Sequence, residues 1–167
     1  MLDEETEARL RVVRERRWAG ERLALALARC GWGGSALARI RGIGRGESRH
    51  TKTVKRWLRD EKPIDPVHQE WLERAEAVVE AGPALLDGPP GGMDWSRLRE
   101  VVLRLRWRLF DRPEVIEARD WQRFADVFRI PQERVAAMVH GQEPVPARLG
   151  DALESIMDGV AEHDGRY

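Results

Sequence analysis

Apolar residues recur along this chain at intervals of three and four positions, which is the spacing of one face of an α-helix. Leu23 and Leu27 show this spacing early in the chain, and Val54 and Leu58 show it again further on. No stretch alternates apolar and polar residues with a period of two, and β-branched residues are sparse. The pattern therefore predicts an all-α fold.

Glycine and proline punctuate the first half of the chain into helical segments. Glycines after the second segment supply a left-handed cap, and Ser35 is the expected N-cap of the third. Pro63 blocks helix continuation, and Pro66 suits the first position of a new helix. The expected helices cover residues 4–17, 21–30, 36–41, 49–59 and 66–81, with the first two either separate or continuous.

A segment rich in proline and glycine, AGPALLDGPPGGMD at residues 81–94, separates the two halves of the chain. Two prolines followed by two glycines cannot continue a helix. We therefore expect two domains, 1–81 and 95–167, joined by a linker at 82–94. The expected helices of the second domain cover residues 95–110, 121–128, 132–140 and 147–163.

The two halves align as an internal repeat. The segment LARIRGI at 37–43 matches FADVFRI at 124–130, and TVKRWLRDEKPIDP at 53–66 matches RVAAMVHGQEPVPA at 134–147. The apolar positions agree, and both copies end in a loop that contains proline, which fixes the register. The first copy carries about six extra residues between the two blocks. Duplication of one small domain explains this match better than chance similarity between helices, and two copies do not make a solenoid.

Charge is unevenly distributed, although the formal net charge is zero. Residues 39–62 hold nine basic and three acidic side chains, whereas residues 151–164 hold five acidic and no basic ones. All three lysines of the chain, Lys52, Lys55 and Lys62, fall in the basic segment. Because arginine supplies the positive charge elsewhere, this cluster favours a site for flexible point charges on phosphate.

The expected helix 49–59 combines an apolar stripe with basic faces. Val54, Trp57 and Leu58 lie at i, i+3 and i+4, so they are expected to be buried on one side. A helix that binds in the major groove must direct donors toward base edges and phosphates. Lys and Arg donate to guanine O6 and N7, Thr and His contact phosphate or base, and a helix N-terminus favours phosphate. This helix is therefore a candidate DNA-binding helix.

The order of helices, turn and proline-containing loop resembles the lambda-repressor/Cro-like helix-turn-helix family, over residues 20–80 and more weakly over 97–157. The residues that carry the resemblance are Trp32, Leu37, Ala38, Arg39, Gly42, Ile43, Thr53, Val54, Arg56, Trp57, Pro63 and Ile64. The family's second helix usually opens with a glutamine, for which Ser35 is a weak substitute. The inserted segment GRGESRH also lengthens the turn, and its Arg45 and Arg49 are expected either to reach phosphate or the minor groove or to lie in a tolerated insertion.

The resemblance implies a transcription regulator of bacterial, phage or mobile-element type that binds double-stranded DNA. The residues expected to contact bases or the groove are Thr51, Lys52, Lys55 and Arg56. The residues expected to hold phosphates are Arg45, Arg49, His50, Arg59 and Lys62. One module offers a small footprint, so specific binding is expected to need a homodimer, or the second copy as partner in an internal pseudo-dimer.

The second copy differs in its chemistry. Its counterpart of the DNA-binding helix holds Arg134 against Glu133 and Glu143, so it would gain little from counterion release. We interpret residues 95–167 as a degenerate helix-turn-helix copy kept for packing, self-association or contact with a protein partner. An alternative for the whole chain is a protein-interaction adaptor or inhibitor, such as a phage-type antiactivator, that uses this scaffold without DNA.

Other classes of function find little support in the residues. No serine, cysteine or carboxylate constellation suggests a catalytic site, so we expect no enzyme and no cofactor. Cys30 is the single cysteine, and the four histidines lack metal-ligand spacing, so no metal site is expected. The first residues lack the apolar segment of a signal peptide, and no run of about 18 apolar residues occurs. We therefore expect a cytoplasmic protein that does not span a membrane.

Overall fold

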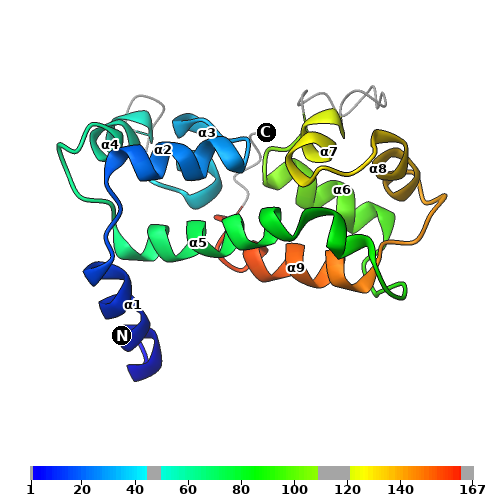
Figure 1. Ribbon diagram of the computed structural model, residues 1–167, viewed down its shortest axis with the longest axis horizontal. Helices are drawn as coiled ribbons and strands as arrows, with labels where there is room; N and C mark the ends of the chain where they lie inside the picture. Colours follow the sequence, from blue (N-terminus) through cyan, green and yellow to red (C-terminus); the bar gives the residue numbers. More distant parts are fainter. Residues whose placement is uncertain (1, 45–49, 109–120, 163–167) are drawn as a thin grey trace. The chain divides into compact units, whose positions relative to one another are not determined.

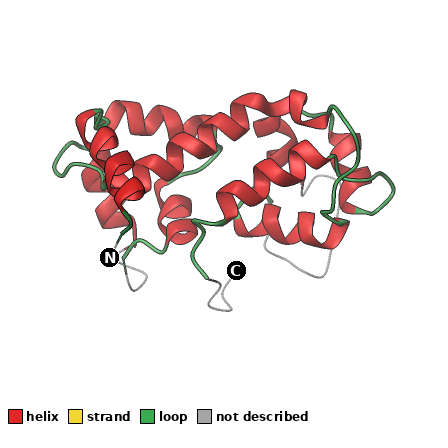
Figure 2. Ribbon diagram, turned by 90° about the horizontal axis from the view of Figure 1, so that it is seen from below, coloured by secondary structure: helices red, strands yellow, loops and turns green. Residues whose placement is uncertain are grey.

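The computed structural model describes residues 2–44, 50–108 and 121–162 of the chain. Within these ranges lie nine α-helices, one 3-10 helix and no β-strand, which confirms the predicted all-α fold (Figure 2). The chain divides into two compact units, Met1–Glu76 and Ala77–Tyr167. No helix in the described ranges is long and apolar enough to cross a membrane.

In the first unit, α2, α3 and α4 pack together, with α5 beside them (Figure 1). The helices of this unit are α1 Glu4–Glu15, α2 Gly20–Arg29, α3 Gly34–Arg41, α4 His50–Leu58 and α5 Pro66–Ala81, which ends in the second unit. Pro66 opens α5 as predicted, whereas the predicted N-cap of α3 was wrong. Gly33 is the N-cap in an extended conformation, so Ser35 lies in the first turn of the helix.

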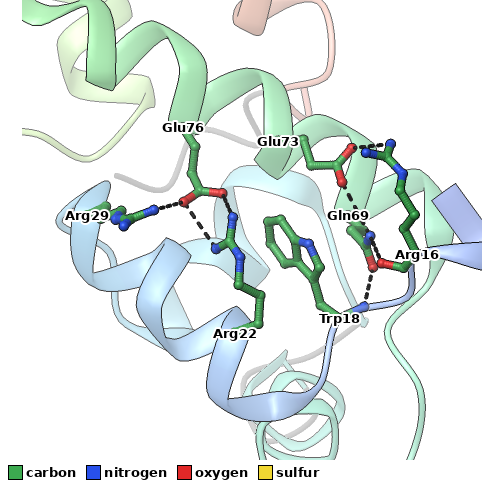
Figure 3. Close-up of polar contacts among 7 residues, drawn as sticks. All are labelled: Arg16, Trp18, Arg22, Arg29, Gln69, Glu73 and Glu76. Carbon is green, nitrogen blue, oxygen red and sulfur yellow. Dashed lines mark hydrogen bonds and ion pairs between the residues drawn. The ribbon is translucent and has the colours of Figure 1, made fainter.

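The break between α1 and α2 is stabilised by one side chain of α5, the fully buried Gln69 (Figure 3). Its Oε1 accepts a hydrogen bond from the Trp18 backbone N–H at 2.9 Å, and its Nε2 donates to the Arg16 carbonyl oxygen at 3.0 Å. Backbone groups at helix ends have no partner within their own helix, so a buried helix end needs such a partner from elsewhere. The two helices are therefore separate rather than continuous.

A second polar contact of α5 holds the side of α2 (Figure 3). Glu76 is 9% exposed, and Arg22 donates to its two carboxylate oxygens at 3.1 and 2.6 Å. Arg29 donates to the same carboxylate at 3.2 Å. A buried charge is costly unless it is paired and hydrogen-bonded. The two arginines satisfy Glu76 and thereby fix α2 against α5.

The start of α2 approaches the end of α4 very closely at Gly20. The Gly20 N–H donates to the Asp60 carboxylate at 2.7 Å, which caps a helix whose own N-cap, Ala19, offers no side-chain acceptor. A Cβ atom at Gly20 would lie 2.2 Å from the carbonyl oxygen of Leu58. Only glycine fits this position without moving backbone.

His68 of α5 is packed between α3 and α4. Its ring centroid lies 5.6 Å from that of Trp57, and its Nδ1 accepts a hydrogen bond from Arg41 Nε at 3.0 Å. The Arg41 guanidinium also lies 5.1 Å from the ring of Trp71. Burial, reinforced by the charge of Arg41, lowers the pKa of His68 to about 4.

The described part of the second unit contains the end of α5 and five further helices around an aromatic core. These are η1 Gly82–Leu86, α6 Trp95–Arg104, α7 Gln122–Phe128, α8 Gln132–Val139 and α9 Ala147–Met157. Trp107, Phe124 and Phe128 are fully buried, and their ring centroids lie 4.7 to 5.8 Å apart. The predicted helix 95–110 ends early, because Arg106 adopts a left-handed conformation.

Residues 82–94, expected to form a linker, belong to the second unit instead. The segment begins with the 3-10 helix η1, which packs on α7 and α9. Its later residues pair with the chain before α9, since Gly91 N–H donates to Val145 O and Ala147 N–H donates to Pro89 O, both at 2.9 Å. Proline and glycine do stop the α-helix here, but the segment packs on its own unit.

Equivalent backbone hydrogen bonds end equivalent helices of the two units. In the first unit the backbone N–H groups of Ile43, Glu61 and Trp32 donate to the carbonyl oxygens of Ala38, Arg56 and Leu27, respectively. In the second unit the N–H groups of Ile130, Gln142 and Trp107 donate in the same order to the carbonyl oxygens of Ala125, Ala137 and Val102. The first two pairs fall on positions that the sequence repeat aligns. The third extends the correspondence to α2 and α6, which the repeat did not include. This agreement supports the duplication, which stays a prediction.

Replacing Gly20 with alanine is expected to destabilise the first unit by about 1–3 kcal/mol, the usual cost of overpacking. Gly92→Ala is the control, because nothing lies within 4 Å of a Cβ atom built there. Urea unfolding of both variants beside the wild type measures the difference. An equal loss of stability in the two variants would contradict the close approach of α2 and α4.

The His68 ring is expected to titrate with a pKa of about 4 in the folded protein, measured by NMR of its ring protons. Because an unfolded histidine has a pKa of about 6.5, the unfolded chain binds the proton first as the pH falls. The stability contributed by neutral His68 is therefore complete above pH 6.5 and is lost as the pH approaches 4. Arg41→Gln is expected to raise the pKa only in part, since burial is the larger cause. Titration near 6.5 in the wild type would contradict this packing.

Candidate nucleic-acid interface

Helix α4 has one buried side and one charged, exposed side. Val54 is fully buried and Trp57 is 4% exposed, and both lie on the side that faces α2 and α3. Lys52, Lys55 and Arg56 are exposed to solvent. Of the apolar stripe expected from the sequence, Val54 and Trp57 are thus buried, whereas Leu58 is half-buried.

Five exposed cations lie on α4 and the loop that follows it: Lys52, Lys55, Arg56, Arg59 and Lys62. We call this set the basic face. Within the described ranges, the side chains of its lysines and of Arg59 form no hydrogen bond or ion pair. Arg56 has one carboxylate neighbour, Glu61, whose Oε2 lies 4.0 Å from its Nε. An anion can therefore approach most of this face without first breaking an ion pair.

Two further charged side chains near the basic face, one acidic and one basic, have partners within the first unit. Asp60 accepts the hydrogen bond from Gly20 described above. Arg41 of α3 points toward His68 and Trp71, and burial lowers its pKa. Arg41 is half-buried against these rings, although the sequence counts it within the basic segment.

The structure describes five of the nine side chains that were predicted to bind DNA. Arg45 and Arg49 lie outside the described residues. His50 and Thr51 begin α4, but their side chains also lie outside them. The other five are the residues of the basic face, so the helix and its exit loop bring together every predicted cation that is described.

Sequence reasoning missed the neighbour of Arg56. Glu61 follows the helix end, where Asp60 adopts a left-handed conformation with φ of 58°. The Glu61 backbone N–H then donates to the Arg56 carbonyl oxygen at 2.9 Å, which returns the loop toward the last turn of α4. The charge of Glu61 was the only signal for this contact in the sequence. The left-handed conformation of Asp60, which turns the loop back, gives no such signal, because a non-glycine residue with positive φ is uncommon.

The corresponding helix of the second unit, α8, lacks this chemistry. At the positions aligned with the basic face stand Glu133, Ala136, Ala137, His140 and Glu143. Arg134, the basic residue within α8, donates from its Nε to Glu143 at 3.0 Å. Its positive charge is therefore neutralised within the unit.

The described residues hold no group of three or more His, Cys, Asp or Glu side chains that could bind a metal ion. No family model matches the chain, and neither a curated protein nor a solved structure matches it. A functional assignment must therefore rest on the residues of this chain and on their geometry.

Proposed function

We propose that this protein binds duplex DNA through α4 and regulates transcription, as a sequence-specific regulator of bacterial, phage or mobile-element type. The basic face carries this proposal: five exposed cations lie on a helix and the loop that follows it, and the opposite side of the helix is buried. An α-helix fits the major groove of B-DNA, and its exposed residues then meet base edges and phosphates. The order of helices and the resemblance to helix-turn-helix proteins support the same function.

Electrostatics favour a polyanion as the partner of the basic face. Each phosphate neutralised by Lys or Arg releases condensed counterions, which supplies affinity that falls steeply with salt. The side chains of Lys52, Lys55 and Lys62 are exposed and form no hydrogen bond or ion pair with described residues, so they lose no such partner when they bind phosphate. The net charge of zero leaves this local patch as the source of attraction.

The second unit is proposed to act in self-association or in contact with a protein rather than with DNA. Its α8 carries neutral and acidic residues at the positions of the basic face. A homodimer is therefore a better source of a second half-site than an internal pseudo-dimer. Trp95 favours a protein contact, because it is 47% exposed and lies 4.7 Å from the Arg99 guanidinium. Tryptophan and arginine are the residue types enriched at interface hot spots.

Fluorescence anisotropy tests the proposal, with the protein titrated onto labelled random-sequence duplex DNA at two salt concentrations. The double variant Lys52→Ala/Lys55→Ala is expected to bind more weakly than the wild type. The slope of log affinity against log salt is expected to become shallower, by about 2 where both lysines neutralise phosphates rather than contact bases. Neither side chain packs in the core, so the fold is expected to persist.

The matched control is Arg11→Ala/Arg14→Ala, which removes the same charge from two exposed residues of α1. This control is expected to change affinity and salt slope little. Equal affinity of the Lys52/Lys55 variant and the wild type would contradict the role of α4. An absence of duplex binding at low salt would instead favour an adaptor whose basic face meets an acidic protein surface.

A further inference from the structure

The exposed polar side chains described on α4 offer hydrogen-bond donors and no acceptors. Lys52, Lys55 and Arg56 are the exposed residues between positions 52 and 58, and ionised lysine and arginine can only donate. Thr53, which can both donate and accept, is half-buried. Of the two carboxylates that follow the helix, Asp60 is engaged by Gly20 and Glu61 lies beside Arg56.

A surface of donors distinguishes between the four bases in the major groove. Guanine presents two acceptors there, O6 and N7. Adenine presents one acceptor and one donor, cytosine presents a donor, and thymine presents one acceptor beside a methyl group. Guanine is therefore the base whose major-groove edge best matches the described face of α4.

Arg56 has the geometry for two simultaneous hydrogen bonds to guanine. Its side chain is 59% exposed, Lys52 lies at i−4 on the same side of the helix, and Arg59 follows the helix end. Glu61 Oε2 lies 4.0 Å from Nε, so the carboxylate stands on the inner edge of the guanidinium. The two terminal nitrogens are then left to donate side by side. A planar pair of donors matches O6 and N7 of one guanine.

We infer that Arg56 is the specificity-determining residue of the proposed DNA interface and that it recognises a guanine in the major groove. This inference rests on the proposed function, since it names the base that the same helix would select. The lysines beside Arg56 supply charge, whereas Arg56 supplies the choice of base.

Selection from a randomised duplex DNA pool tests the inference, with the full-length protein as bait and sequencing of the retained duplexes. The wild type is expected to enrich sites that contain a fixed guanine. Arg56→Gln replaces the pair of donors with one donor and one acceptor, which match adenine, so enrichment of guanine at that position is expected to fall on the order of tenfold. Arg59→Gln is the matched control and is expected to leave the enriched site unchanged, because Arg59 lies beyond the end of α4.

A second measurement identifies the acceptor atom. Replacing the fixed guanine with 7-deazaguanine removes N7, and this is expected to weaken wild-type binding but not binding by Arg56→Gln. An enriched site without guanine, or the same guanine enriched by Arg56→Gln, would overturn the inference and leave DNA binding intact. Salt-sensitive retention of the pool without any enriched site would overturn it as well. No retention at low salt would overturn both the inference and the proposed function.

Discussion

Burial of Val54 and Trp57 determines which side of α4 faces solvent, and the proposed interface depends on it. Side chains three and four residues apart share one side of a helix, so packing this pair against α2 and α3 leaves Lys52, Lys55 and Arg56 outside. The close approach of α2 at its glycine and the histidine of α5 against Trp57 complete the packing around the helix. The orientation of the basic face is therefore a consequence of core packing.

Charges in the first unit fall into two groups that differ in their partners. Arg22 and Arg29 pair with the buried Glu76, and these contacts fix α2 against α5. The lysines of α4 have no such partner among the described residues. Ion pairs at the surface contribute little stability, so the fold does not need these lysines to be paired.

The two units share a pattern of backbone hydrogen bonds and buried residues but differ in their exposed residues. Equivalent hydrogen bonds end their helices, and the apolar positions of α4 and α8 correspond. The exposed positions do not, since cations in α4 become alanine or glutamate in α8. Core positions determine how a helix packs, whereas solvent-facing positions determine what it binds. A repeat in the core pattern therefore predicts a repeated architecture and leaves the function of each copy to its surface.

Local periodicity in the sequence determined the helices, the buried stripe of α4, the basic segment and the register of the repeat, because each depends on residues a few positions apart. The tertiary structure decided what depends on distant pairs. Gln69 accepts a hydrogen bond at the break between α1 and α2 from Trp18, which lies 51 positions away in the chain. His68 accepts a hydrogen bond from Arg41 and so holds its side chain against α5. Backbone hydrogen bonds between residues 89–91 and residues 145–147 place the expected linker in the second unit. The composition of a segment cannot reveal such contacts, because the partner is chosen by packing in three dimensions.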